Sequence, residues 1–138
     1  MTKQNFISSA RSVSDIKCHL VLTTKYRHNI FNNKMILRLE EIFKTLIEEK
    51  WSCRLIEFNG ESDHVHLLIQ YTPQIQLSKL VNNLKTVSSR YLKKEFEQRF
   101  KLFLGNKALW NGSYFVASCG GVTIEQLKLY VQNQERPD

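Results

Sequence analysis

The chain has 138 residues, a length typical of one domain that buries about two-thirds of the surface exposed by its unfolded form. Its 20 lysines and arginines outnumber 13 acidic residues, so the formal charge of +7 favours a polyanionic partner, with nucleic acid ahead of a membrane surface. Three cysteines without a C-x-x-C pair, no apolar leader and no stretch of about 18 apolar residues predict a cytoplasmic protein that is neither secreted nor membrane-spanning.

Periodicity and turn residues predict four strands and two helices, followed by a final helix. In chain order they are a strand at 17–24, a basic loop at 25–29, a helix from Asn32 or Asn33 to about 47, strands at 51–58 and 63–71 with a turn at 59–62, a helix at 77–100, a turn at 105–107, a strand at 114–119 and a helix at about 122–136. The order βαββαβ predicts an α+β, ferredoxin-like antiparallel sheet with helices on one face, plus a C-terminal helix. No linker is visible, so residues 1–138 are expected to form a single domain.

Two histidines stand out in the predicted strand at 63–71. His64 and His66 are two residues apart, so both should project from one face, while Val65 and Leu67 project from the other. Asp63 would point to the opposite face if the strand has begun, and a turn or strand-edge role is favoured for it. An H-x-H pair alone is common by chance, so a metal site needs a further ligand from elsewhere.

The last helix is the best source of that ligand. Tyr130 and Gln134 are four residues apart and therefore neighbours on one helix face. Two imidazoles and an amide oxygen would leave positions open for phosphate oxygens and would favour Mg²⁺ or Mn²⁺ over a closed thiolate zinc site. Considered alone, Tyr130 is more simply a packing residue and Gln134 a surface residue.

Basic residues supply candidate contacts to nucleic acid phosphates. They are Lys25 and Arg27 in the first loop and Lys85, Arg90 and Lys93 on the long helix. A solvated surface is the favoured alternative for any one of them. Tyr26, Trp110 and Tyr114 could stack on unpaired bases, although burial is the better expectation for Trp110 and Tyr114.

Five segments together resemble the HUH single-tyrosine transposases of the insertion sequence 200/605 family. They are CHLVLTTKYR at 18–27, SDHVHLL at 62–68, LW at 109–110 with SYFV at 113–116, GG at 120–121 and LYVQNQ at 129–134. Each segment is a weak signal, but all of them in this order and at these spacings form a specific pattern. The resemblance covers residues from about 14 to 134.

The resemblance implies that His64, His66 and Gln134 bind the metal and that Tyr130 is the nucleophile. It further implies a homodimer in which the tyrosine helix of one subunit can complete the histidine site of the other, with Gly120-Gly121 as the hinge. Such enzymes cleave and rejoin single-stranded DNA at element ends, recognise subterminal hairpins and pass through a 5′-phosphotyrosine. No nucleotide cofactor is expected, because the sequence contains no P-loop motif.

Two other classes remain as alternatives at this point. A non-catalytic ferredoxin-like module that binds RNA or DNA would share the element order, but neither central strand has the paired aromatic residues typical of such modules. A metal-dependent hydrolase could use His64 and His66 with water as nucleophile, but that function would leave Tyr130 without a role.

Overall fold

The computed structural model describes residues 7–9, 12–118 and 124–134. Its strands are β1 (Ile7–Ser9), β2 (Ser12–Ser14), β3 (Ile16–Thr23), β4 (Arg54–Gly60), β5 (His64–Tyr71) and β6 (Phe115–Ser118). Its helices are η1 (Lys25–Arg27), α1 (Asn33–Thr45), η2 (Leu46–Lys50), α2 (Leu77–Glu95), α3 (Glu97–Phe103) and α4 (Ile124–Gln132). No helix within these ranges is long and apolar enough to cross a membrane.

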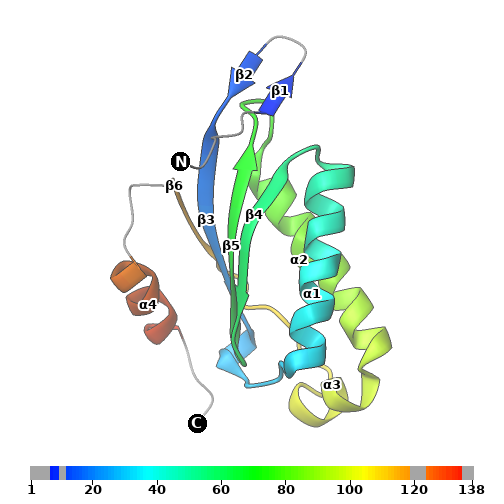
Figure 1. Cartoon of the computed structure of the whole chain (residues 1–138). Coiled ribbons are helices and arrows are strands. Elements are labelled where there is room, and N and C mark those ends of the chain that lie inside the picture. Colours follow the sequence, from blue (N-terminus) through cyan, green and yellow to red (C-terminus); the bar gives the residue numbers. More distant parts are fainter. Residues whose placement is uncertain (1–6, 10–11, 119–123, 135–138) are drawn as a thin grey trace.

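The main sheet has the strand order β4-β5-β3-β6, and every neighbouring pair is antiparallel. Helices α1 and α2 cover one face, and α4 lies on the other side of the sheet (Figure 1). This arrangement is the ferredoxin-like α+β fold, so the fold predicted from the sequence is confirmed. That the whole chain forms one domain stays a prediction.

Side-chain alternation in β5 directs one face of the sheet into the core. Val65, Leu67 and Ile69 are almost fully buried and belong to the cluster that packs against α1 and α2. Helix α1 starts where its sequence predicts, because the side chain of Asn32 accepts a hydrogen bond from the Met35 amide at 2.9 Å. The other face of β5 is therefore free to carry polar groups.

Several predicted boundaries were wrong. The helix predicted at 77–100 breaks at Phe96, whose φ of −126° and ψ of 47° are not helical. The strand predicted from Trp51 begins at Arg54, because α1 continues through the π-helical segment η2 up to Lys50. The first loop contains a 3₁₀ turn in which Tyr26 and Arg27 both have a φ of 54°.

The strand predicted at 63–71 begins at His64, one residue later than predicted, and this changes the orientation expected for the Asp63 side chain. Because Asp63 precedes the strand, the alternation of side chains does not place it on the opposite face. The small β1–β2 hairpin was not predicted. The Gly120-Gly121 hinge and the predicted helix start near residue 122 lie outside the described residues.

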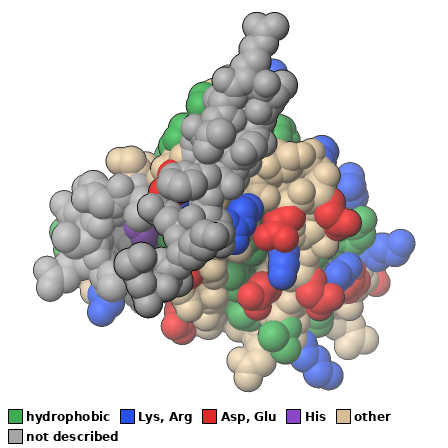
Figure 2. All heavy atoms as spheres, turned by 45° about the horizontal axis from the view of Figure 1, so that its top comes forward, with side chains coloured by type: hydrophobic (Ala, Val, Ile, Leu, Met, Phe, Trp, Pro, Cys, Tyr) green, Lys and Arg blue, Asp and Glu red, His purple; other side chains and the backbone are tan. Residues whose placement is uncertain are grey.

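Figure 2 shows how the charged side chains are distributed over the described part of one face. On the right of that view, Lys and Arg side chains alternate with Asp and Glu side chains. Among the described residues, Arg38 and Glu95 form a bidentate contact at 2.8 and 3.0 Å. Net charge alone therefore does not locate a nucleic acid surface on this face.

Candidate active site

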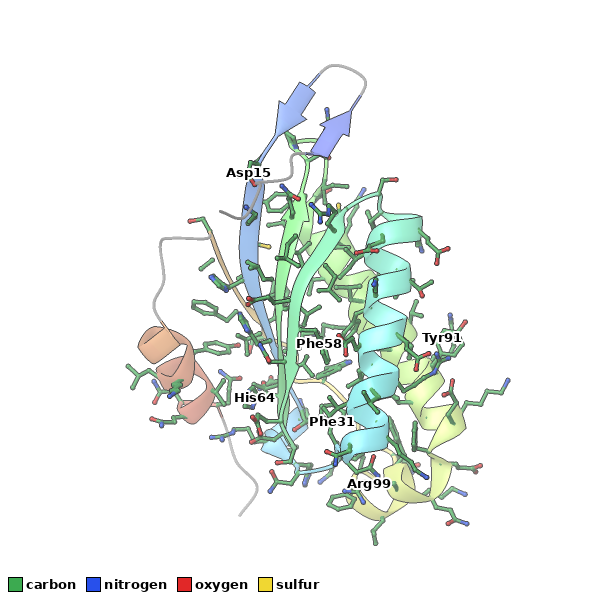
Figure 3. All side chains as sticks on the ribbon, viewed as in Figure 1. Asp15, Phe31, Phe58, His64, Tyr91 and Arg99 are labelled. Carbon is green, nitrogen blue, oxygen red and sulfur yellow. The ribbon has the colours of Figure 1, made fainter. Side chains whose placement is uncertain are left out.

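His64 and His66 project from the sheet face opposite the main core, as the alternation predicts. In the antiparallel pairing of β3 with β5, His64 lies opposite Thr23 and His66 lies opposite Val21. Figure 3 shows His64 at one end of the sheet, on the side where α4 lies. The two imidazoles and α4 thus occupy the same side of the sheet.

A pocket of about 250 Å³ separates the histidine pair from α4. The described residues that line it are Val21, His64 and His66 from the sheet and Lys128, Val131 and Gln132 from the helix. Val131 packs against Val21 in a small apolar cluster separate from the main core. The pocket is where a phosphate group could meet both histidines.

His64 is held by a neighbouring carboxylate. Its Nδ1 lies 2.8 Å from Oδ1 of Asp63, which is itself buried. Since a carboxylate only accepts hydrogen bonds, this contact favours a proton on Nδ1 and leaves Nε2 with its lone pair. That is the arrangement usual for a histidine that binds a metal.

His66 interacts with a third histidine. Its Nε2 lies 2.9 Å from Nδ1 of His19, and the two rings stack with centroids 5.1 Å apart. Burial lowers the pKa of His66 below the ordinary 6.5; His19 lowers it further, Glu57 raises it, and His64 lowers it. His66 is therefore mainly neutral at pH 7, as a metal ligand must be, and a cation on its Nε2 would replace His19.

Tyr130 lies on α4 and packs against the small cluster of Val21 and Val131. Its ring contacts Phe115 of β6, with centroids 5.0 Å apart, and it is absent from the described pocket lining. Its hydroxyl is buried and has no hydrogen-bond partner among the described residues. Burial raises the pKa of Tyr130 above its ordinary value of 10, and the nearby side chains of Ser113 and Gln134 offset part of the rise.

Gln134 is held by hydrogen bonds to the end of β3 and to the segment before β6. Its Oε1 accepts hydrogen bonds from Asn111 Nδ2 at 2.8 Å and from Thr23 Oγ1 at 3.3 Å. Thr23 is the residue paired with His64 across the strands. The structure therefore connects Gln134 to the strand residue opposite His64, and Tyr130 packs on Val21 and Val131, which line the histidine pocket.

The donor set fits a divalent cation with oxygen-rich ligation. The described residues contain no group of three or more His, Cys, Asp and Glu side chains arranged for a metal. The histidine pair therefore needs an amide, water or phosphate oxygen to complete a coordination shell. Among the described side chains, Gln134 and Gln132, which lines the pocket, can supply such an amide oxygen. An open shell of this kind suits Mg²⁺ or Mn²⁺.

The predicted phosphate contacts do not form one surface. Lys85 donates to the backbone carbonyls of Asn111 and Gly112 at 2.9 and 3.3 Å, and burial lowers its pKa. Arg90 and Lys93 line a different pocket of about 370 Å³ on α2 and α3.

The two basic residues of the first loop also have different environments. Arg27 is buried in an ion pair with Asp63 at 3.0 Å, whereas the Lys25 ammonium lies 5.3 Å from the centroid of the Tyr26 ring. Trp110 is buried, as expected, and its Nε1 donates to Ser88 Oγ at 3.0 Å. Lys25 and Tyr26 are only half-buried and can still contact a ligand, whereas Arg27 and Trp110 are buried.

Two polar residues of the site were assigned no role from the sequence, and a third was assigned a different one. His19 contacts His66, Asn111 contacts Gln134, and Asp63, for which a turn or edge role was favoured, contacts His64. The available signal for His19 was its place two residues before Val21 on a strand rich in β-branched and aliphatic residues. No sequence signal connects Asn111 to the last helix.

Comparison with known families decides the class of protein. Residues 12–134 match the family described as IS200-like transposase. The chain belongs to this family. The resemblance seen in the sequence is thereby confirmed, and membership indicates an enzyme that cleaves and rejoins DNA.

Individual family members and solved structures agree. The ISDra2 transposase TnpA of Deinococcus radiodurans is 31% identical over 123 residues, covering 88% of this chain and 86% of its own length. The transposase for insertion sequence element IS200 of Salmonella typhimurium is 29% identical over 132 residues, or 95% and 84% of the two chains.

Two solved structures have the same fold. A crystal structure of a protein from Deinococcus radiodurans, assigned as a transposase, aligns with a TM-score of 0.81 and 30% identity over 99% of this chain and 100% of that one. A REP-associated tyrosine transposase bound to a REP hairpin aligns with a TM-score of 0.52 and 8% identity over 95% and 67%. The second likeness concerns the fold alone.

Proposed function

We propose that this transposase cleaves and rejoins single-stranded DNA at the ends of an insertion sequence, with Tyr130 as the nucleophile. The phenolic oxygen attacks phosphorus, the bond from phosphorus to the 3′-oxygen breaks, and the 3′-hydroxyl leaves with a proton. The 5′-phosphate stays on Tyr130, so its bond energy is retained for rejoining. The observation that carries this proposal is the pocket between the histidine pair and the helix that bears Tyr130.

His64, His66 and Gln134 are the residues that would hold a divalent cation, Mg²⁺ or Mn²⁺. When bound, such a cation supplies Lewis-acid polarisation of the scissile phosphate. The free Nε2 of His64 and the lowered pKa of His66 support this assignment. No nucleotide is needed, since the transesterification keeps the number of phosphoester bonds constant.

Tyr130 has to leave its contact with Phe115 before it can attack. In the observed position its hydroxyl is buried and its pKa is raised, both of which disfavour the phenolate. Helix α4 therefore has to be repositioned, either over its own sheet or over that of a second copy. The second route corresponds to a homodimer in which each helix completes the partner's histidine site, and we propose it together with recognition of subterminal hairpins.

A covalent adduct tests the nucleophile directly. The full chain is incubated with Mg²⁺ or Mn²⁺ and a 3′-labelled single strand that carries the element end, and the products are separated under denaturing conditions. We expect a labelled protein band that Tyr130→Phe abolishes. The matched control is Tyr91→Phe, which removes a hydroxyl from α2 in the opposite layer (Figure 3) and should retain the band. A band of normal intensity with Tyr130→Phe would show that another residue is the nucleophile.

A further inference from the structure

We propose that Asp63 and Arg27 are positioning residues of the histidine site. The Asp63 carboxylate holds the His64 imidazole in the tautomer that leaves Nε2 free, and the Arg27 guanidinium holds the carboxylate in turn. This inference rests on the proposed metal-assisted function and assigns two residues to it. It also replaces the expected role of Arg27 as a phosphate contact.

Asp63 bridges a ligand and a cation with its two oxygens. Oδ1 lies 2.8 Å from His64 Nδ1, and Oδ2 accepts from Arg27 Nε at 3.0 Å. The Asp63 side chain is only 11% exposed and that of Arg27 only 7%. A buried carboxylate with both oxygens engaged has little freedom to turn, which is what orientation of an imidazole requires.

The backbone of Asp63 is fixed as well. Its carbonyl accepts hydrogen bonds from the Thr24 amide at 2.9 Å and from Thr24 Oγ1 at 3.2 Å. Thr24 lies directly after β3, so the segment before β5 is attached to the end of the neighbouring strand. The positions of the Asp63 carboxylate and of His64 are thus both fixed relative to the main sheet.

Arg27 is turned inward by an uncommon backbone conformation. Tyr26 and Arg27 both have a φ of 54°, in the left-handed region, which costs on the order of 1–3 kcal/mol for a residue other than glycine. A surface arginine that served only a solvated loop would gain nothing from this conformation. The conformation places the guanidinium on Asp63 and its Nη1 3.5 Å from the Gln132 carbonyl, at the end of α4.

The competing explanation is that Arg27 and Asp63 form a purely structural ion pair. The tautomer of His64 distinguishes this explanation from a positioning role. We would record ¹⁵N NMR spectra of the imidazoles in the metal-free full chain, at a pH where the spectra show His64 to be neutral. The expected result is a single tautomer with the proton on Nδ1. Protonation on Nε2 in the unmodified chain would overturn the proposal without any variant.

Variants then measure the consequence for metal binding, with Mn²⁺ alone as the probe in calorimetric titrations. Asp63→Asn should populate the Nε2–H tautomer and weaken Mn²⁺ binding about 10- to 100-fold, the usual loss when a partner of a ligating histidine is removed. Arg27→Gln keeps the carboxylate but not its support, and we expect a loss of several-fold. Unchanged affinity and tautomer in Asp63→Asn would show that the pair is only structural.

Asp15→Asn is the matched control. Asp15 lies at the opposite end of the sheet from His64 (Figure 3) and pairs with Lys17 at 2.8 Å. This substitution also removes one carboxylate from a residue directly before a strand, so unchanged Mn²⁺ affinity and an unchanged His64 tautomer are expected. A loss equal to that of Asp63→Asn would overturn the proposal, because net charge would then explain the effect.

Two further outcomes separate this inference from the function on which it rests. If His64→Ala binds Mn²⁺ as tightly as the unmodified chain, the histidine site itself is wrong. If His64→Ala abolishes binding but Arg27→Gln leaves it unchanged, the function stands and the role of Arg27 is wrong. Should Asp63→Asn fail to fold, as judged by circular dichroism, the wild-type tautomer and Arg27→Gln decide the matter.

Discussion

The two faces of the sheet are built from the same strands but are covered in different ways. One face packs Leu20, Leu22, Val65 and Leu67, each no more than 1% exposed, against α1 and α2. Among the described side chains, the other face contacts α4 through the small cluster of Val21 and Val131, a few hydrogen bonds and an open pocket. Most of the free energy of folding should therefore come from the first face.

This difference explains how one β-strand can serve both stability and chemistry. Alternate residues of β5 enter the main core, while His64 and His66 keep access to the open pocket beside α4. Apolar burial contributes about 25 cal/mol per Å², so the described side chains of α4, of which only Val131 is buried, hold the helix less firmly than the main core holds α1 and α2. Such a loosely held helix is what repositioning of Tyr130 requires.

The largest expected effect is the loss of cleavage in His64→Ala. Removal of this ligand should lower the rate about 1,000-fold or more, equivalent to about 4 kcal/mol of transition-state stabilisation. Global stability should change by less than about 1 kcal/mol, because the side chain lies outside the main core. Rates of adduct formation and chemical denaturation would be measured on the same preparation.

The matched control reverses that pattern. Leu67→Ala removes a fully buried side chain from the same strand and should cost about 2–5 kcal/mol of stability. At a temperature where the variant is still folded, its cleavage rate should stay near that of the unmodified chain. A similar loss of stability in His64→Ala would contradict the division between the two faces.

How far the sequence could predict these faces depends on the range of the interactions. Period-two alternation predicted the two sides of β5, and helical spacing predicted α1 and α2, because both patterns are local. The contact of His19 with His66 spans 47 residues and depends on the register of β3 against β5. Register is a property of the folded sheet, so this partner could not be predicted.

The buried position of Arg27 escaped prediction for a different reason. Left-handed turns are signalled by glycine, asparagine or aspartate, and the segment Lys25-Tyr26-Arg27 contains none of these. Its composition instead indicates an exposed basic loop. The tertiary contact with Asp63 prevails over that local preference. His64, His66, Tyr130 and Gln134 were selected from the sequence, but their roles stay proposals.

An intermediate effect is expected for the attachment of α4. Thr23→Val removes the hydroxyl that donates to Gln134 while keeping the shape of the side chain, at a cost of about 1 kcal/mol. Amide hydrogens of α4 should then exchange about five-fold faster, and those of β5 should be unaffected. The control is Thr86→Val on the exposed surface of α2. Equal acceleration in β5 would mean that the helix and the sheet open together.

The smallest effect is the pH dependence of the same contact. Because burial raises the pKa of Tyr130 above 10, attachment of α4 is fully favoured below pH 10 and is lost as the pH rises through the raised pKa. NMR titration of a chain labelled at the tyrosine Cζ should show one signal, absent in Tyr130→Phe, that titrates above 10. Titration of that signal at or below 10 would indicate that Tyr130 is not held in its buried position.

We infer that the sheet face beneath α4 is catalytic and that Tyr130 is its nucleophile. Mass spectrometry of the protease-digested covalent adduct identifies the residue that carries the DNA. We predict one modified peptide, covering α4, in which the 5′-phosphate of the DNA is attached to Tyr130. Attachment to any other residue, or cleavage of the single strand with no covalent adduct, would contradict the account.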